Sequence, residues 1–296
     1  MVEGQVRQEF GLAENVHLET KIGQFDGSAC RRYLAHMSTQ PDPPPVAEGD
    51  VSLAIDDGVG TIEFSHPKGN SLPSALLVQL AEGIGMLADD PAARVIVLGS
   101  GGTGAFCAGA SFDELVAISS EREGEEFFSG FAKVILAMVR APKFVLVRVH
   151  GRAAGGGVGI AAAGDYTFAV KSASVKLSEL SVGIGPFVVG PVIERRIGRG
   201  AFAAIAVDTD WRDAGWCERH GLYARVFDDV DAMDAALALL ARALAHSNPA
   251  AMGAMKQTFW EGTGDWDALL AARARMSGAL VLSDYTRAAI AKFRER

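Results

Sequence analysis

The sequence is poor in the features that mark membrane-spanning, disulfide-bonded and zinc-binding proteins. No apolar stretch reaches the roughly 18 residues that cross a bilayer, and the opening "MVEGQVRQEF" lacks the basic-then-apolar layout of a signal peptide. Three cysteines, Cys30, Cys107 and Cys217, lie far apart without a C-x-x-C pair, which argues against a disulfide framework or a zinc knuckle. We therefore expect a soluble, cytoplasmic protein with free thiols, no metal site and no membrane partner.

An excess of basic residues is also missing. The 296 residues carry 28 Lys and Arg against 36 Asp and Glu, a formal net charge of −8. Nucleic-acid phosphates are bound through clustered Lys and Arg, so we expect no nucleic-acid partner. An anionic small molecule would need a local basic site.

Internal repeats with a period of 20 to 50 residues are absent as well, which excludes solenoid folds. Three parts are expected: an extension with a Pro-rich linker, flexible or lying on the surface, over residues 1–48; an α/β core over 49–199; and a helical region over 200–296. Met37 is an alternative start, because residues 37–296 hold every motif discussed below, so residues 1–36 need not be native.

Apolar periodicity predicts how strands and helices alternate. "VSLAIDDGVGTIEFS" reads as strand, turn and strand. The next segment places Leu72, Leu76, Leu80 and Ile84 on one helical face. Further along, buried strands are expected within 93–102 and 143–151, a helix within 125–141, two short extended pieces within 165–180, and four or five helices from residue 200 onward. The alternation indicates an α/β core followed by helices.

Three consecutive glycines, Gly155 to Gly157, precede a run of small apolar residues that reads as a buried helix. Glycines at such a junction can simply permit tight packing or a positive φ. Alternatively, they leave the unpaired N–H groups of a helix N-terminus open to an anion. The sequence "GGGVGIAA" has neither the Lys-Ser/Thr of a P-loop nor a dinucleotide-site context, so a developing oxyanion is the remaining candidate.

A second small-residue turn, "GTGAFCAGASFDEL", follows the strand expected at 95–98. Two such turns, each after a buried strand and each opening a helix, can direct two N–H groups at one oxygen atom. The pair is a stronger indication of an oxyanion site than either turn alone.

These segments resemble the crotonase family, the enoyl-CoA hydratase and isomerase superfamily. The resemblance rests on "SHPKGNSLPSALLVQL", on "AFCAGASFDEL" and on "VHGRAAGGGVGIAAAGDYTFAVKSASVKLSELSVGIGP", and it continues to the terminal "AAIAKFRER". It implies repeated β-β-α units with a helical C-terminal region, assembly as homotrimers or homohexamers, and an acyl-CoA thioester as substrate, with no further cofactor. The implied role lies in enoyl-CoA chemistry such as fatty acid metabolism.

The same resemblance assigns site residues. The N–H groups of Ala110 and Gly156 would bind the thioester oxygen, so that an enolate forms beside it. The substrate would lie along Ala108, Gly109, Gly155 and Pro186. Lys68 would contact the pantetheine-phosphate region of the coenzyme, and Phe293 and Arg296 of the last helix would reach the ligand of a neighbouring subunit.

One family glutamate is missing from the chain. Family hydratases carry two glutamates that hold and activate water; here Gly159 stands at the first position, and Glu179 occupies the second. Moving a double bond needs a single base. In hydration, one carboxylate would have to activate the water and also protonate carbon, or a second group would have to help, for which Glu194 is the first candidate. We expect Glu179 to be the acid/base, with a pKa raised by apolar neighbours such as Leu177, Leu180 and Val182.

Several functions remain open at this point. The leading ones are hydration of a 2-enoyl-CoA and Δ3,Δ2 isomerisation of a 3-enoyl-CoA. A decarboxylase or C–C lyase would use the same oxyanion site with different pocket walls, and a catalytically silent acyl-CoA-binding paralogue would keep only the fold. Phe187 and Val188, in place of the usual P-G-x-G-G-T region, are expected to reshape the acyl pocket.

Overall fold

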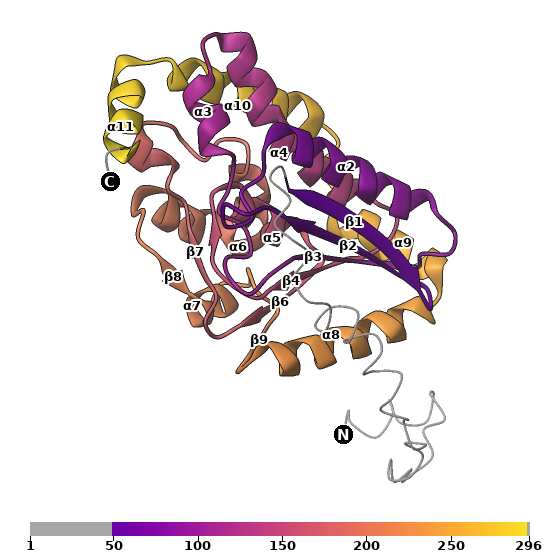
Figure 1. Ribbon diagram of the computed structural model, residues 1–296. Coiled ribbons are helices and arrows are strands. Elements are labelled where there is room, and N and C mark those ends of the chain that lie inside the picture. The colour runs from indigo at the N-terminus through magenta and orange to yellow at the C-terminus, as the bar shows by residue number, and fades with distance from the viewer. Residues whose placement is uncertain (1–48, 295–296) are drawn as a thin grey trace, which may run out of the picture. The chain divides into compact units, whose positions relative to one another are not determined.

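A computed structural model describes residues 49–294 of the chain (Figure 1). The extension expected over residues 1–48 lies outside the described residues. In chain order the elements are β1 (Asp50–Asp56), β2 (Val59–Ser65), α2 (Ser74–Asp89), β3 (Val95–Ser100), α3 (Phe112–Ala117), α4 (Glu121–Arg140), β4 (Val145–Val149), β5 (Ala153–Ala154), α5 (Gly156–Ala163), β6 (Tyr166–Val170), β7 (Ser174–Lys176), η1 (Glu179–Val182), α6 (Gly190–Val207), β8 (Arg212–Asp213), α7 (Ala214–Arg219), β9 (Arg225–Phe227), α8 (Val230–Ala245), α9 (Pro249–Phe259), α10 (Trp266–Val281) and α11 (Asp284–Arg294).

The first two strands form the hairpin that the sequence predicts. Their pairing runs from Asp50 opposite Ser65 to Asp56 opposite Val59. The two-residue turn between them has positive φ at both positions, 46° at Asp57 and 77° at Gly58. Such a turn suits a hairpin because its backbone twist matches that of the flanking strands. Asp-Gly is a favoured pair for it because both residues tolerate a positive φ.

The hairpin continues into a sheet of six strands in the order β1-β2-β3-β4-β6-β9. Every pair after the hairpin is parallel. All residues of β3 and β4 are buried, as expected for strands of a parallel sheet covered on both faces. In Figure 1, α2, α4 and α10 lie above this sheet and α8 lies below it. This is the mixed α/β architecture expected from the alternation of strands and helices.

Helices α4 and α10 approach each other closely through two glycines. A Cβ atom at Gly124 would lie 2.6 Å from the Cα atom of Gly278. Glycine at both positions therefore allows the two helix backbones to touch, and α10 covers the helix that lines the site described below.

A smaller sheet has the order β5-β7-β8. The β5 and β7 strands are parallel, with Ala154 opposite Lys176, and β8 joins β7 antiparallel, with Arg212 opposite Val175. Because β5 leads directly into α5, this sheet fixes where the glycine triplet begins.

The C-terminal part contributes to the main sheet as well as supplying helices. The boundary expected between residues 199 and 200 falls within α6, whose course bends at Gly198 with φ 80° and ψ 156°. Beyond it, β9 pairs with β6 and completes the six-stranded sheet. Sequence analysis foresaw almost no strand here, because a three-residue strand is too short to show periodicity.

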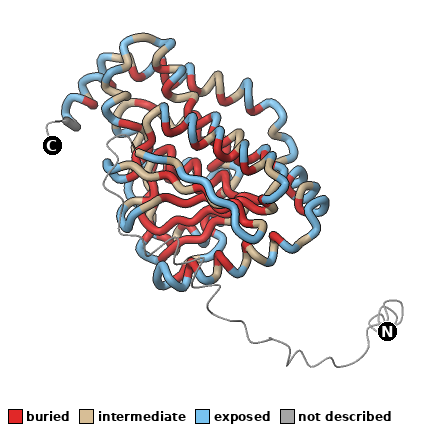
Figure 2. Tube along the Cα trace, turned by 45° about the vertical axis from the view of Figure 1, so that its right-hand side comes forward, coloured by how far each residue is buried: buried red, intermediate tan, exposed pale blue. Residues whose placement is uncertain are grey.

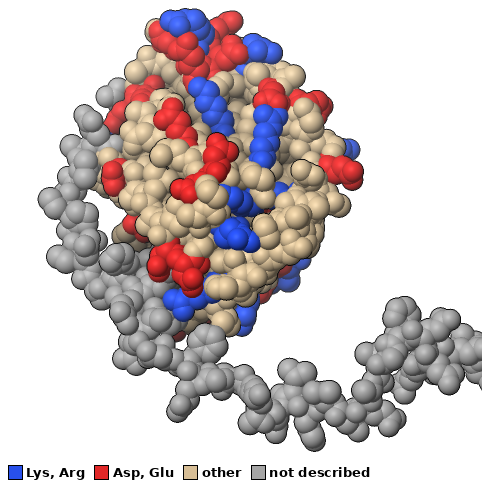
Figure 3. Space-filling model, turned by 90° about the vertical axis from the view of Figure 1, so that its right-hand side faces the viewer, with Lys and Arg blue, Asp and Glu red and all other residues tan. Residues whose placement is uncertain are grey.

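Burial follows the layers of the fold. Figure 2 shows the central strands buried, whereas β1 at the sheet edge is mostly exposed. On the face drawn in Figure 3, acidic and basic side chains are interspersed and no broad patch of one sign forms. Among residues 49–294, no helix combines the length and apolar character that a bilayer crossing requires.

Candidate active site

The first turn of the site lies between β3 and α3. Gly109, with φ 96°, accepts a hydrogen bond from the Leu72 N–H at 2.8 Å, and the Ser111 N–H returns one to Leu72 O at 3.2 Å. These two hydrogen bonds fix the backbone of the turn on both sides of Ala110. Within residues 49–294 the Ala110 N–H itself donates to no protein acceptor, so it remains open to a ligand.

The second turn joins β5 to α5 at the glycine triplet. Gly155 adopts φ 50° and ψ −115°, and its N–H donates to Lys176 O at 2.9 Å. Gly156 is the first residue of α5, where an N–H has no partner inside the helix. A side chain here would overlap Phe131, since a Cβ atom at Gly156 would lie 2.1 Å from its ring. The glycines therefore serve both tight packing and an open N–H, the two alternatives raised by the sequence.

The two turns meet. Cys107 bonds to both neighbours of Ala153: its N–H donates to Arg152 O at 3.1 Å, and its carbonyl accepts from the Ala154 N–H at 2.8 Å. A Cβ atom at Gly109 would lie 3.2 Å from Ala154 O and 3.9 Å from Gly156 N. The open N–H groups that the sequence assigned to one oxygen thus lie on adjoining backbone segments.

Glu179 stands beside this junction. It opens η1, and a Cβ atom at Gly155 would lie 3.1 Å from its Oε1 atom. Its Oε2 atom is buried without a hydrogen-bond partner. Burial raises the pKa of Glu179 to about 7, against the opposing effect of the backbone N–H groups of Glu179 and Ser178. The direction agrees with the expectation from sequence.

The apolar neighbours expected around Glu179 are present in part. Leu177 is buried and Val182 is half-buried and faces the site. Leu180, however, is 50% exposed, because the tight turn of η1 directs it to the surface. Desolvation of the carboxyl therefore comes from other groups around the cavity, not from Leu180.

Both turns and Glu179 line one cavity of about 370 Å³. Its remaining wall comes mainly from α3, α4, residues 184–189 and the smaller sheet, with Ser277 of α10. The sequence-derived candidates found on this wall are Ala108, Gly109, Ala110, Gly155, Gly156, Glu179 and Pro186, and Phe187 and Val188 lie there as well. The cavity thus brings together every candidate expected near the thioester.

The candidates for coenzyme contacts are not gathered there. Lys68 is exposed, forms an ion pair with Asp113 and does not line the cavity. Phe293 belongs to α11, but its side chain lies outside the described part of the structure, as does the whole of Arg296.

No space exists for a second carboxylate at residue 159. A Cβ atom at Gly159 would lie 2.6 Å from Cγ1 and 2.9 Å from Cβ of Val189, and 3.5 Å from Cδ1 of Ile135. Glu194 does not replace it, because its carboxylate accepts a hydrogen bond from Arg199 Nε at 2.8 Å on the exposed side of α6. Among the described cavity residues, Glu179 is the one carboxylate.

Sequence reasoning missed several side chains of the cavity wall. Phe127 and Phe131 stand four residues apart on α4, a helical spacing that could have been noticed. Lys176 ends β7, and Trp211 immediately precedes β8. No local pattern in the sequence joins these two.

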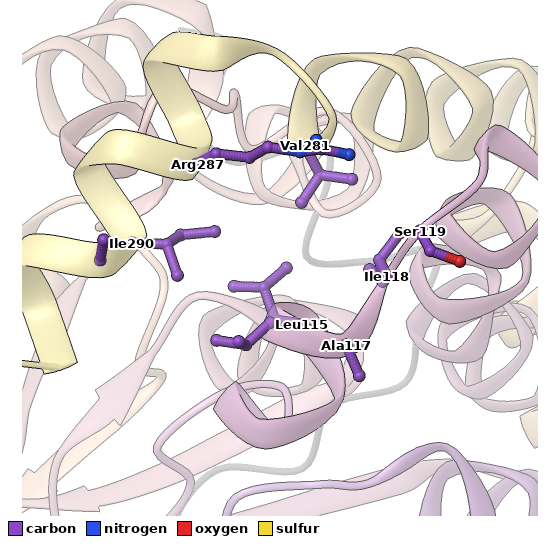
Figure 4. A pocket seen from close by; sticks show the side chains of 9 residues that line it. Leu115, Ala117, Ile118, Ser119, Val281, Arg287 and Ile290 are labelled. Atoms are coloured by element: carbon purple, nitrogen blue, oxygen red, sulfur yellow. The ribbon is translucent and has the colours of Figure 1, made fainter.

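A second cavity, of about 530 Å³, lies on the other side of Leu115. Figure 4 shows Leu115 and Ile118 facing Val281 and Ile290 across it, between the α3 region and the end of α10 with α11. Leu115 lines both cavities and separates them.

Comparison with known proteins agrees with this arrangement. The family model for enoyl-CoA hydratase/isomerase matches residues 54–296. Carnitinyl-CoA dehydratase of Salmonella enteritidis PT4 is 30% identical over 199 residues, which cover 67% of this chain and 75% of that protein.

Two solved structures show the similarity of fold. The crystal structure of an enoyl-CoA hydratase from Mycobacterium avium has a TM-score of 0.71 at 27% identity, covering 83% of this chain and 96% of that one. That of enoyl-CoA hydratase from Bacillus halodurans has a TM-score of 0.77 at 19% identity, covering 82% and 99%. With its crotonase fold and a family match that spans most of its length, the chain belongs to the enoyl-CoA hydratase/isomerase family.

Proposed function

We propose that this protein forms a thioester enolate from an acyl-CoA and moves one proton through Glu179 alone, converting a 3-enoyl-CoA into the conjugated 2-enoyl-CoA. The observation that carries this proposal is the closed space at Gly159, which leaves Glu179 as the one carboxylate among the described residues of the cavity. A shift of a double bond needs one base, because the proton taken from one carbon is returned to another.

The open N–H groups of Ala110 and Gly156 would bind the thioester oxygen. Negative charge grows on this oxygen as the α-proton leaves, and fixed donors stabilise it by about 3 to 4 kcal/mol each. The cavity wall around this point is rich in phenylalanine side chains, including Phe131 against Gly156. Exclusion of water by these rings strengthens the interaction of both donors with the enolate.

Glu179 would take the α-proton and return it to the γ-carbon. The substrate then loses and regains one proton, and its double bond moves into conjugation with the thioester. A pKa of about 7 suits both steps, since the carboxylate is populated at neutral pH and the carboxylic acid is a competent proton donor.

Hydration of a 2-enoyl-CoA is the second candidate. The printed names of relatives and structural neighbours, carnitinyl-CoA dehydratase and enoyl-CoA hydratase, favour it. In this case Glu179 would both activate the water and protonate the α-carbon. Hydration requires two roles of one carboxylate, so we place it after isomerisation.

Further aspects of the proposal follow from family membership. We propose a cytoplasmic homotrimer or homohexamer that uses no cofactor beyond the coenzyme A of its substrate. Two alternatives remain: a decarboxylase or C–C lyase, and a silent paralogue that binds acyl-CoA. The experiment below tests the proposed reaction against both.

The test offers the purified full chain a 3-enoyl-CoA and, separately, crotonyl-CoA, while the absorbance of the conjugated thioester is followed. A gain with the first substrate, abolished in Glu179→Gln, is the expected result. Loss of absorbance with crotonyl-CoA alone would instead establish hydration. Binding of both thioesters without any change would contradict proton transfer and favour the silent paralogue or another acyl substrate.

A further inference from the structure

Three side chains gather at one face of the smaller sheet: Lys176 ends β7, Arg152 immediately precedes β5 and Trp211 immediately precedes β8. The register places Ala154 opposite Lys176 on the neighbouring strand, and the pairing of Val175 with Arg212 places Trp211 next to Lys176 on the third. Arg152 is exposed just before β5 and lies on the same side as Trp211, because its guanidinium contacts that ring. Ala154, Lys176 and Trp211 all line the cavity that holds Glu179, which identifies this face as the cavity side.

The two cations gather around one indole ring. The guanidinium carbon of Arg152 lies 5.4 Å from the ring centroid of Trp211, and the Lys176 ammonium lies 6.0 Å from it. The ring is 42% exposed, so part of it remains open to a ligand. Such contacts hold both cations near the ring while their N–H groups remain free to donate.

Neither cation has a carboxylate partner among the described residues. The acidic side chains nearest in sequence to Trp211 are engaged elsewhere: Asp208 pairs with Arg212, and Asp213 caps α7 by accepting from the Trp216 N–H. In a chain of net charge −8, two cations without a carboxylate partner beside one indole require an explanation. Lys176 lines the cavity, and Arg152 contacts the Trp211 ring from outside the cavity lining.

We propose that Arg152, Lys176 and Trp211 form a subsite for an anionic group, carboxylate or phosphate, carried by the bound thioester. This inference rests on the proposed function, because the thioester is placed by Ala110 and Gly156. Arg and Lys donate charge-assisted hydrogen bonds to either anion, and the indole packs against its apolar stem.

The distance from the oxyanion turn limits where that anion sits. Adjacent strands lie roughly 5 Å apart. The backbone of Lys176 is therefore one strand spacing from Ala154, the residue before the turn, and the backbone of Trp211 is two strand spacings from it. A carboxylate a few bonds from the thioester carbonyl can reach the subsite. A phosphate of the coenzyme can do so where the pantetheine arm leaves along the smaller sheet. Both sources present anionic oxygen acceptors to the same cations, and the experiment separates the two sources.

The experiment measures binding of saturated thioesters, which undergo no double-bond chemistry, by calorimetry. Four ligands are compared: butyryl-CoA, glutaryl-CoA, S-butyryl-pantetheine and S-glutaryl-pantetheine. The variants are Lys176→Met and Arg152→Met. The matched control is Arg225→Met, because Arg225 also stacks on an aromatic ring, with its guanidinium 4.6 Å from the Phe227 centroid, but does not line the cavity.

We expect Lys176→Met and Arg152→Met each to weaken binding of an anion-bearing ligand about tenfold and to leave S-butyryl-pantetheine within about twofold. A loss with S-glutaryl-pantetheine identifies an acyl carboxylate as the anion, and a loss with butyryl-CoA identifies a coenzyme phosphate. Equal losses for all four ligands, or none for any, would overturn the subsite and leave the proposed function standing. Failure of the unmodified protein to bind any of the four would overturn both proposals.

Discussion

The side chain of Val189 occupies the space that a side chain at residue 159 would need. A Cβ atom at Gly159 would lie 2.6 Å from Cγ1 of Val189, closer than real Cβ atoms approach another carbon. Val189 precedes α6 and is buried, so it cannot turn away into solvent. The loss of the first family glutamate is therefore built into the packing of α5 against this segment.

We expect Gly159→Ala to destabilise the protein by about 1 to 3 kcal/mol, because overpacking of a filled core outweighs the helix propensity that alanine adds. Combining it with Val189→Ala should cost less than the sum of the two single changes, since the smaller side chain admits the new methyl group. Denaturant unfolding of the three variants checks this.

Gly85→Ala is the control for that series. Gly85 lies within α2, and a Cβ atom there would meet nothing within 4 Å. This change should stabilise the protein by up to about 1 kcal/mol. Stabilisation by Gly159→Ala of the same size, or strict additivity with Val189→Ala, would show that Val189 does not fill the site.

Glu179→Gln should lower kcat for a 3-enoyl-CoA at least about 100-fold, because the amide cannot accept the α-proton. In the unmodified protein, kcat/KM should rise with pH through a midpoint near the Glu179 pKa of about 7, since the base acts in its ionised form. Initial rates across the pH range measure both effects.

Glu194→Gln serves as the comparison for Glu179→Gln. Its carboxylate pairs with Arg199 outside the cavity, so rates should stay within about twofold. A similar fall in rate for both variants, or a profile without a step near pH 7, would contradict the role of Glu179.

The raised pKa of Glu179 also predicts how stability depends on pH. Its folded-state pKa of about 7 lies above the ordinary value of 4.5, so the folded protein binds the proton more tightly than the unfolded chain. The resulting stability is fully present below pH 4.5 and is lost as pH rises through 7. The free energy of unfolding of Glu179→Gln, measured relative to that of the unmodified protein, should therefore increase by about 2 kcal/mol when the pH is raised from 5 to 8. Thermal unfolding at both pH values tests this, and a stability difference that does not change with pH would argue against it.

Lys256 and Asp165 form a buried ion pair in which the ammonium is fully bonded. The Lys256 Nζ atom donates to Asp165 Oδ2 at 2.5 Å, to Met138 O at 2.8 Å and to Lys143 O at 3.2 Å. We expect Lys256→Met to destabilise the protein by about 3 to 5 kcal/mol, because it leaves the carboxylate buried without its cation. Denaturant unfolding measures the loss.

Lys68→Met is the matched change at an exposed ion pair, where the cost should be at most about 1 kcal/mol. If both lysine substitutions cost the same small amount, burial of the Lys256 pair would not matter to stability.

Much of this arrangement could be read along the chain. The hairpin at Asp57 and Gly58, the strands before the two small-residue turns, and the motif around Glu179 are all local patterns, because turn residues and apolar periodicity act over a few residues.

Other features needed the fold. Leu180 follows Glu179 directly, yet η1 turns it outward. Glu194, the candidate second carboxylate, pairs with Arg199 outside the cavity. The three-residue strand β9 gives no periodic signal but completes the main sheet. In each case the outcome depends on which face of an element meets the rest of the protein.

By itself the sequence determined that two glycine turns follow buried strands and that one glutamate stands where family members keep theirs, because these are properties of short segments. Only the tertiary structure decided that Val189 closes the space at Gly159 and that Lys176 and Trp211 face Arg152 across a sheet. Those contacts join residues from separate strands and helices, and distances between such residues are set by packing and strand register, not by local propensity.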